Sequence, residues 1–253
     1  MKTKILFFIS VLCSSFYVHA SSFAKGDTNK TNNAGKKVGL WKEKMAQSDC
    51  YGNYVDDKKE GQWICYHANG IISNIAEYKN GMLNGASIFL DKTGFYYNKE
   101  TYTNDTLNGK SISYFSGAKV RSETEYKMGI LDGVKKIYYS DGKIQEEGRY
   151  KNSVRDGAAK WFYPDGQVSV EYQYINGSLE GAQKSFYKNG NVNSETKFVN
   201  NLENGDYIEY FENGKIKITG KYVQGKKEGV WKEFDEKGKV IKTEKYKNGE
   251  LKK

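Results

Sequence analysis

The stretch "FYKNGNVNSETKFVNNLENG" at residues 186–205 combines two aromatic residues, an Asn-Gly pair, an alternating run ending in Phe198, and a second Asn-rich bend. Asn-Gly between alternating runs is typical of a β-hairpin. The last glycine of the stretch recurs every 24 residues without an insertion. This series is Gly61, Gly85, Gly109, Gly133, Gly157, Gly181, Gly205 and Gly229. A fixed period in the twenties indicates a repeat protein, whose fold is one unit stacked many times.

Each unit contains two bends. We call the bend at Asn189-Gly190 and its equivalents the first bend, and the bend at Asn200-Asn201 and its equivalents the second bend. The two bends divide the unit into segments of six to eight residues, which is strand length. A 24-residue β-hairpin is therefore predicted for each unit. An aromatic residue precedes each second bend, at Tyr54, Tyr78, Tyr102, Tyr126, Tyr150, Tyr174, Phe198, Tyr222 and Tyr246.

The first bends predict a specific turn. Five of them carry Asn-Gly or Asp-Gly, which suits the positive φ angles of a two-residue type I′ turn. If Asn189 and Gly190 are the turn residues, Tyr187 lies opposite Val192. The same register brings opposite charges together in three successive units, as Lys136 with Glu147, Lys160 with Glu171, and Lys184 with Glu195. Each such pair stabilises a sheet only modestly.

Because side chains alternate along a strand, the repeats predict an aromatic row on each face. The tyrosine row comprises Phe115, Tyr139, Tyr163, Tyr187 and Phe211, and is expected beside Val120, Ile144, Val168, Val192 and Ile216. The second aromatic row comprises Tyr66, Leu90, Tyr114, Tyr138, Phe162, Phe186, Tyr210 and Phe234. The predicted fold is all-β, an elongated antiparallel meander of hairpins that forms a single twisted layer.

The first twenty residues differ from the repeats. Lys2 and Lys4 precede an apolar run, and Val18 and Ala20 occupy the small-residue positions of a signal-peptidase site. We therefore predict a signal peptide at residues 1–20, a flexible polar linker at 21–38 and the repeat domain at 39–253. The protein is expected to be exported and to be periplasmic, cell-surface or secreted.

Four segments with the pattern Tyr-x-x-Gly-x-x-x-Gly resemble the core of MORN repeats: "YKNGMLNG", "YKMGILDG", "YINGSLEG" and "YVQGKKEG". The resemblance covers about residues 39–253 and is closest to the variant repeat of bacterial proteins, including YwqK-type antitoxins. It implies an elongated β-sheet scaffold for proteins or lipids, and the antitoxin likeness would imply neutralisation of a toxin. An export signal departs from the antitoxin pattern, because an inhibitor of an intracellular toxin would not need one.

The repeats offer little catalytic chemistry. After signal removal His67 is the single histidine, and it lies beside a first bend as a variant of the tyrosine row. No Ser-His-Asp or Cys-His set recurs, and no Cys, His and acid cluster has metal-ligand spacing. We therefore predict a protein that is not an enzyme and has no cofactor.

The formal net charge of +9 does not indicate a nucleic-acid partner, because lysines alternate with glutamates at the repeat period. A solvated surface with weak attraction to anionic membranes explains this pattern better.

Two functions fit this sequence. One is a scaffold that binds a protein partner through the tyrosine row. The other is a carbohydrate or envelope-polymer module in which exposed rings stack on sugars, although the tryptophans at positions 41, 63, 161 and 231 are scattered. The alternative to both is that the rings only stabilise their own sheet.

A disulfide is also predicted. Cys50 and Cys65 remain after signal removal, and an oxidising compartment would let them pair. If Asp57 and Lys58 form the bend, Tyr54 faces Gly61 and the two cysteines lie opposite each other.

Overall fold

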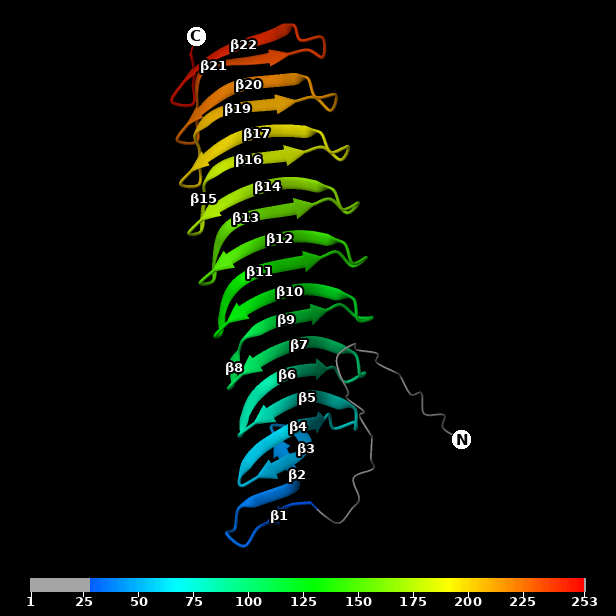
Figure 1. Ribbon diagram of the computed structural model, residues 1–253. Helices are drawn as coiled ribbons and strands as arrows, with labels where there is room; N and C mark the ends of the chain where they lie inside the picture. Colours follow the sequence, from blue (N-terminus) through cyan, green and yellow to red (C-terminus); the bar gives the residue numbers. More distant parts are fainter. Residues whose placement is uncertain (1–27, 253) are drawn as a thin grey trace, which may run out of the picture.

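The computed structural model describes residues 28–252, and the predicted signal peptide lies outside them. The described residues form one sheet of 23 strands and contain no helix. Each strand pairs antiparallel with a neighbour in the chain, so that the hairpins stack along one long axis (Figure 1). The predicted all-β meander is confirmed.

The strands follow one another in chain order, and three of them are preceded by a two-residue piece. The first half contains β1 (Lys30–Thr31), β2 (Lys37–Met45), β3 (Ser48–Val55), β4 (Lys58–Tyr66), β5 (Ile72–Lys79), β6 (Met82–Leu90), β7 (Tyr96–Thr103), β8 (Thr106–Leu107), β9 (Gly109–Tyr114), β10 (Val120–Lys127) and β11 (Ile130–Tyr138). The second half contains β12 (Ile144–Lys151), β13 (Val154–Phe162), β14 (Val168–Ile175), β15 (Ser178–Leu179), β16 (Gly181–Phe186), β17 (Val192–Val199), β18 (Leu202–Glu203), β19 (Gly205–Tyr210), β20 (Ile216–Val223), β21 (Lys226–Phe234), β22 (Val240–Lys247) and β23 (Glu250–Lys252).

The sheet begins inside the segment that the sequence predicts as a linker. Strand β1 pairs with β2 through Lys30 opposite Val38, and β2 itself starts at Lys37. The described part of the segment 21–38 therefore joins the sheet.

The second bends are two-residue turns with positive φ at both positions, as type I′ turns require. Met128 and Gly129 have φ of 50° and 80°, and this turn joins β10 to β11. The equivalent turns are Asp56-Asp57, Asn80-Gly81, Asn104-Asp105, Asn152-Ser153, Asn176-Gly177, Asn200-Asn201, Gln224-Gly225 and Asn248-Gly249. Asparagine is frequent here because its short polar side chain tolerates this conformation.

The first bends are longer than predicted. Tyr187 N–H donates to Asn191 O at 2.8 Å, which leaves three loop residues, and only Gly190 among these has positive φ. Asn189 instead accepts a hydrogen bond from Asn191 N–H on its Oδ1 at 2.9 Å. The loop is therefore a type I turn closed by a left-handed glycine. The type I′ prediction for these bends was wrong because an Asn-Gly pair suits both loops.

This longer loop changes the register beside the bend and no further. Val192 lies opposite Phe186 and not Tyr187, and a bulge then restores the predicted pairing of Lys184 with Glu195. Three predicted ion pairs are accordingly present, Lys136–Glu147 at 3.1 Å, Lys160–Glu171 at 2.6 Å and Lys184–Glu195 at 3.2 Å. The apolar residues expected beside the tyrosine row instead pair with the second aromatic row, as Tyr114–Val120, Tyr138–Ile144, Phe162–Val168, Phe186–Val192 and Tyr210–Ile216.

The 24-residue glycine series lies at a second bulge. Gly133 has φ of 136°, and a Cβ atom there would lie 2.7 Å from the Cβ atom of Glu125. Both the conformation and the close approach favour glycine at this position, and the positive φ is shared by all eight glycines of the series, which explains why glycine keeps the period.

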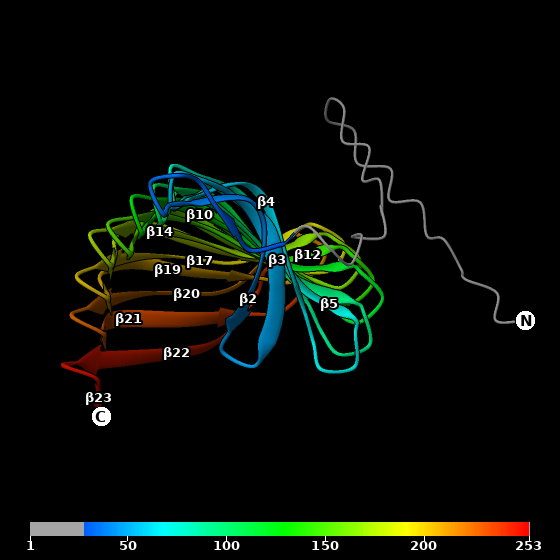
Figure 2. The same ribbon diagram turned by 90° about the horizontal axis from the view of Figure 1, so that it is seen from below.

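The sheet has one buried face. We call it the inner face, and it contains all the buried side chains, namely Cys50, Tyr54, Trp63, Cys65, Ala76, Ser87, Thr124, Ala159, Thr196 and Trp231. Figure 2 shows that the strands arch and that β22 is steeply inclined to β3, as expected of a twisted sheet. Side chains on the inside of an arch converge, so we infer that the inner face is the concave side.

Candidate protein-binding surface

The tyrosine row lies where each strand enters a first bend, and its hydroxyl groups are used within the sheet. Tyr163 donates a hydrogen bond to Phe186 O in the next hairpin at 2.7 Å. Tyr139 and Tyr187 make the same contact, to Phe162 O and Tyr210 O. All five members of the row are half-buried. This placement gives the row a structural role that needs no partner.

His67 occupies the equivalent position in the first of these bends. Its Nε2 lies 2.9 Å from Leu90 O, so the imidazole replaces the tyrosine hydroxyl in the same contact. Asp91 takes the position in the next unit, and its carboxylate accepts a hydrogen bond from Thr93 N–H within its own loop at 2.8 Å.

Exposed apolar side chains gather at the opposite edge of the sheet. They belong to the residue pairs that close the second bends, such as Val199 opposite Leu202. We call those in the five consecutive hairpins from β10 to β21 the outer apolar strip, and its members are Ile130, Val154, Ile175, Val199, Leu202 and Val223. Their exposed fractions lie between 39% and 52%. Val55 and Met82 are exposed at equivalent bends nearer the N-terminus.

The outer apolar strip lies on the convex face. Phe198 precedes Val199 and packs on the inner face, where its ring centroid is 6.5 Å from that of Tyr172. Successive side chains in a strand point to opposite faces, so Val199 points outward. The strip spans five hairpins, which is roughly 40 Å when strands are about 4.8 Å apart.

Backbone hydrogen bonds hold the second bends together along this edge. Gly177 N–H donates to Arg155 O in the preceding hairpin at 2.8 Å, and Gly225 N–H donates to Glu203 O at 2.8 Å. Every equivalent turn makes this bond, from Asp57 to Lys37 O at one end to Gly249 to Lys227 O at the other. The strip is therefore fixed on a rigid ladder.

Tryptophan and lysine side chains stack against each other on the inner face. The ammonium group of Lys59 lies 4.0 Å from the ring centroid of Trp63, and Lys227 lies 4.3 Å from that of Trp231. Trp63 and Trp231 are only 1% and 6% exposed. Such covered rings cannot stack on a sugar.

One carboxylate lies at the centre of the first of these clusters. Glu43 Oε1 accepts hydrogen bonds from Lys37 Nζ at 2.7 Å and from Tyr54 Oη at 2.8 Å. Lys59 Nζ lies 3.4 Å from the other carboxylate oxygen. Burial alone would raise the pKa of Glu43, but these two hydrogen bonds and the charge of Lys59 lower it below its usual value.

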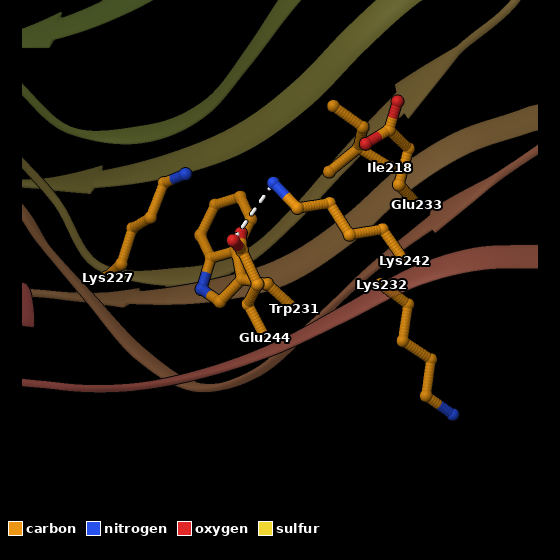
Figure 3. Close-up of a pocket in the computed structure, with 7 residues that line it drawn as sticks. All are labelled: Ile218, Lys227, Trp231, Lys232, Glu233, Lys242 and Glu244. Carbon is orange, nitrogen blue, oxygen red and sulfur yellow. Dashed lines mark ion pairs between the residues drawn. The ribbon is translucent and has the colours of Figure 1, made fainter. Parts of the chain in front are cut away.

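The inner face also contains a hollow of about 150 Å³ beside Trp231 (Figure 3). Lys242 and Glu244 form an ion pair of 2.9 Å across it, and Lys232 points away from the ring. Lys242 and Glu244 thus neutralise each other, while Lys227 lies over the ring of Trp231.

The two cysteines lie opposite each other in β3 and β4 and form a disulfide. The route to this pairing differs from the expected one. Asp56 and Asp57 form the turn, so Tyr54 faces Lys59 and not Gly61. A bulge in β4, opposite Gly52, then shifts the register and brings Cys50 opposite Cys65.

Residues 28–252 contain no helix of the length and hydrophobicity that a membrane span requires. Over the same residues, no three His, Cys, Asp or Glu side chains lie close enough to hold a metal ion.

The family is shown by the repeat pattern. The MORN repeat variant matches at residues 59–80, 131–152, 155–176, 179–200, 203–224 and 227–248, which together make up more than half of the chain. The chain belongs to the MORN repeat variant family. Each matched segment of this MORN repeat variant protein begins in the strand that follows a second bend, continues through the first bend, and includes the next strand. No curated protein matches the chain.

Two solved structures show only a weak likeness to this MORN repeat variant protein. One is the S. aureus TarM G117R mutant in complex with Fondaparinux, alpha-GlcNAc-glycerol and UDP, with 16% identity and a TM-score of 0.24 over 47% of this chain and 19% of that chain. The other is a porin-like protein from Bacteroides uniformis, with 9% identity and a TM-score of 0.15 over 86% of this chain and 91% of that chain. Likeness at this level supports no argument about ligand or function.

Proposed function

We propose that the protein is an exported, non-enzymatic repeat scaffold that binds a protein partner along the outer apolar strip. The observation that supports this most is the strip itself: six aliphatic side chains remain exposed in five consecutive hairpins. Large exposed apolar patches usually mark interaction sites. The tyrosine row is a poorer candidate, because its hydroxyl groups bond within the sheet.

The repeat itself does not require apolar residues in the strip. Lys151 occupies the position equivalent to Ile175 and Val199, and Ser178 occupies the position equivalent to Leu202. Lysine and serine therefore close the same type of bend in neighbouring hairpins. The aliphatic side chains add exposed hydrophobic area without a need in the fold, which favours a binding role.

The tryptophans do not favour a carbohydrate module. That function depends on accessible aromatic rings, whereas Trp63 and Trp231 are buried under lysine side chains. The antitoxin likeness finds no further support either.

The test replaces strip residues with those of other repeats. The triple variant Ile175→Lys, Val199→Lys, Leu202→Ser should melt like the original protein and lose capture of its partner from a cell-envelope extract. The control is Lys184→Gln with Glu195→Gln, which changes the same face at mid-sheet and should keep capture. Chemical cross-linking and mass spectrometry would identify the partner, and binding would be repeated with that purified protein. Unchanged capture by the triple variant would refute the strip as the interface.

Export is tested separately. The mature protein should begin at or near Ser21, as read by mass spectrometry of protein from the native cell. A cytoplasmic protein that retains Met1 would contradict this part of the proposal.

A further inference from the structure

Phe95 and Tyr97 are the exposed aromatic residues of the described chain. Their exposed fractions are 53% and 51%, whereas every other tyrosine, phenylalanine and tryptophan from 28 to 252 is buried or half-buried. Both residues lie at the first bend between β6 and β7, far from the outer apolar strip at the other edge of the sheet (Figure 1).

The two rings depart from the repeat. Most other units have polar residues at the position of Phe95, namely Lys119, Lys143, Gln167, Asn191, Lys215 and Lys239. Most also have polar residues at the position of Tyr97, namely Ser73, Arg121, Gln145, Ser169, Asn193 and Lys217. Since these bends keep the same loop geometry without a ring, the fold does not require an aromatic residue at either position.

The loop that carries the rings is well ordered by its own hydrogen bonds. Asp91 N–H donates to Phe95 O at 2.9 Å, and Asp91 Oδ1 accepts from Phe95 N–H at 3.1 Å. The ring centroid of Tyr97 lies 6.3 Å from that of Phe89. A backbone ordered in this way loses little entropy when a partner binds.

Positive charges adjoin the rings. Ser113 in β9 pairs with Asn98 in β7 on one side and with Ser122 in β10 on the other. Tyr97 precedes Asn98 and Arg121 precedes Ser122, so the backbones of Tyr97 and Arg121 lie two strands apart, roughly 10 Å. Arg121 Nε donates to Ser113 Oγ at 3.3 Å, which orients its guanidinium group along this edge.

The surrounding bends contain little negative charge to offset these cations. Lys92 lies in the bend of the two rings. Lys119 does not contribute, because its Nζ donates a hydrogen bond to Ser140 O at 3.0 Å, in the following bend away from the rings. The neighbouring bends at 67–73 and 115–121 contain no acidic residue. Asp91 is the acid of the bend itself, and its carboxylate is occupied by the loop.

We propose that Phe95 and Tyr97, together with Lys92 and Arg121, form a docking point for an acidic peptide segment of another protein. An apolar side chain of that segment would pack against the two rings, and its carboxylates would meet the two cations. Aromatic and arginine side chains commonly dominate the energy of such contacts. This docking point shares no residue with the outer apolar strip, and either can fail alone.

In the experiment, peptides that bind the immobilised full-length protein are selected from a displayed library of random peptides. The enriched peptides should combine Asp or Glu with Leu, Ile or Phe, and their affinity should be measured by fluorescence polarisation. The variant Phe95→Lys with Tyr97→Gln, which uses residues of other repeats, should weaken binding at least tenfold. Lys92→Gln with Arg121→Gln should weaken it about tenfold and reduce its salt dependence.

Two matched controls keep the outcome interpretable. Lys143→Gln changes the first bend that lies two units after the rings. This variant and the triple variant of the outer apolar strip should both keep peptide affinity within twofold. Thermal melting should be unchanged in all variants, because each new side chain is found in another repeat or is a small polar replacement. The proposal is overturned if no peptide binds above background, if the enriched peptides have no acidic excess, or if they bind the ring variant as tightly as the original protein.

Discussion

Gly220 lies across a hairpin from Trp231, and a Cβ atom on Gly220 would lie 2.2 Å from the indole ring. Gly52 and Trp63 repeat the arrangement seven units earlier, also at 2.2 Å. Neither glycine has positive φ, so the conflict is purely one of volume. Each tryptophan on this row of the inner face therefore fits only because its neighbour lacks a side chain.

Gly220→Ala should destabilise the protein by about 1–3 kcal/mol, as overpacking of a buried site does. Gly148 is the matched control, because it occupies the equivalent position and its added methyl group would come no closer than 2.9 Å to another atom, Nη1 at the end of the Arg155 side chain. Urea unfolding of both variants measures the difference. Equal loss in the two proteins would show that the indole ring is not the cause.

The tyrosine row should stabilise the sheet through its hydroxyl groups. Tyr163→Phe keeps the ring and removes the bond to Phe186 O, and should cost about 0.5–1.5 kcal/mol. Tyr97→Phe is the control, since that hydroxyl lies on an exposed ring and its loss should leave stability unchanged. If Tyr163→Phe melts like the original and abolishes partner capture, the row is an interface after all.

Acid should weaken the cluster around Glu43. The folded protein holds the pKa of this carboxyl below its usual 4.5, so the unfolded chain takes up the proton first as the pH falls. The stabilisation is present above pH 4.5 and is lost as the pH falls through the lowered folded-state pKa. Glu43→Gln should therefore show a smaller fall in melting temperature between neutral and acid pH. An unchanged acid profile in this variant would contradict the assignment.

The disulfide should be found in protein purified without reductant. Cys50 and Cys65 are separated by 15 residues, and closing a loop of this length stabilises a protein by about 3 kcal/mol in the chain-entropy account. Thiol titration and peptide mass spectrometry measure the bond directly, and Cys50→Ser with Cys65→Ser should melt earlier. Two free thiols in the untreated protein would refute the prediction.

The sequence was sufficient for the unit, the stacking and the mid-strand register. The 24-residue periods of the glycine and aromatic series have direct causes. Gly133 occupies a bulge with positive φ, which favours glycine, and Tyr126 lies beside this bulge on the inner face. The ion pair between Lys160 and Glu171 was predictable because two departures from the predicted register cancel. The first bend has one residue more than predicted, and the bulge beside it shifts the register back.

The orientation of residues beside the bends was not predictable from the repeat alone. Asn189-Gly190 suits a two-residue or a three-residue loop, and one added residue moves Val192 from Tyr187 to Phe186. The outer apolar strip was not predicted, because its aliphatic residues alternate with polar ones at the repeat period, whereas the aromatic rows are nearly continuous. The sequence did contain a signal for the strip. Ile175 and Val199 are aliphatic at a position of the repeat where Lys151 shows that a charged residue is tolerated.

The bond from Gly177 N–H to Arg155 O and its equivalents has a mechanical consequence. Every strand lies across the long axis of the sheet, so tension applied at the two ends of the chain loads the contacts of one hairpin at a time. Contacts that are peeled in sequence resist far less force than contacts that are sheared together. Each 24-residue unit would release roughly 80 Å of chain at about 3.4 Å per residue as it opens. Under tension the molecule should behave as a tether that lengthens in equal steps.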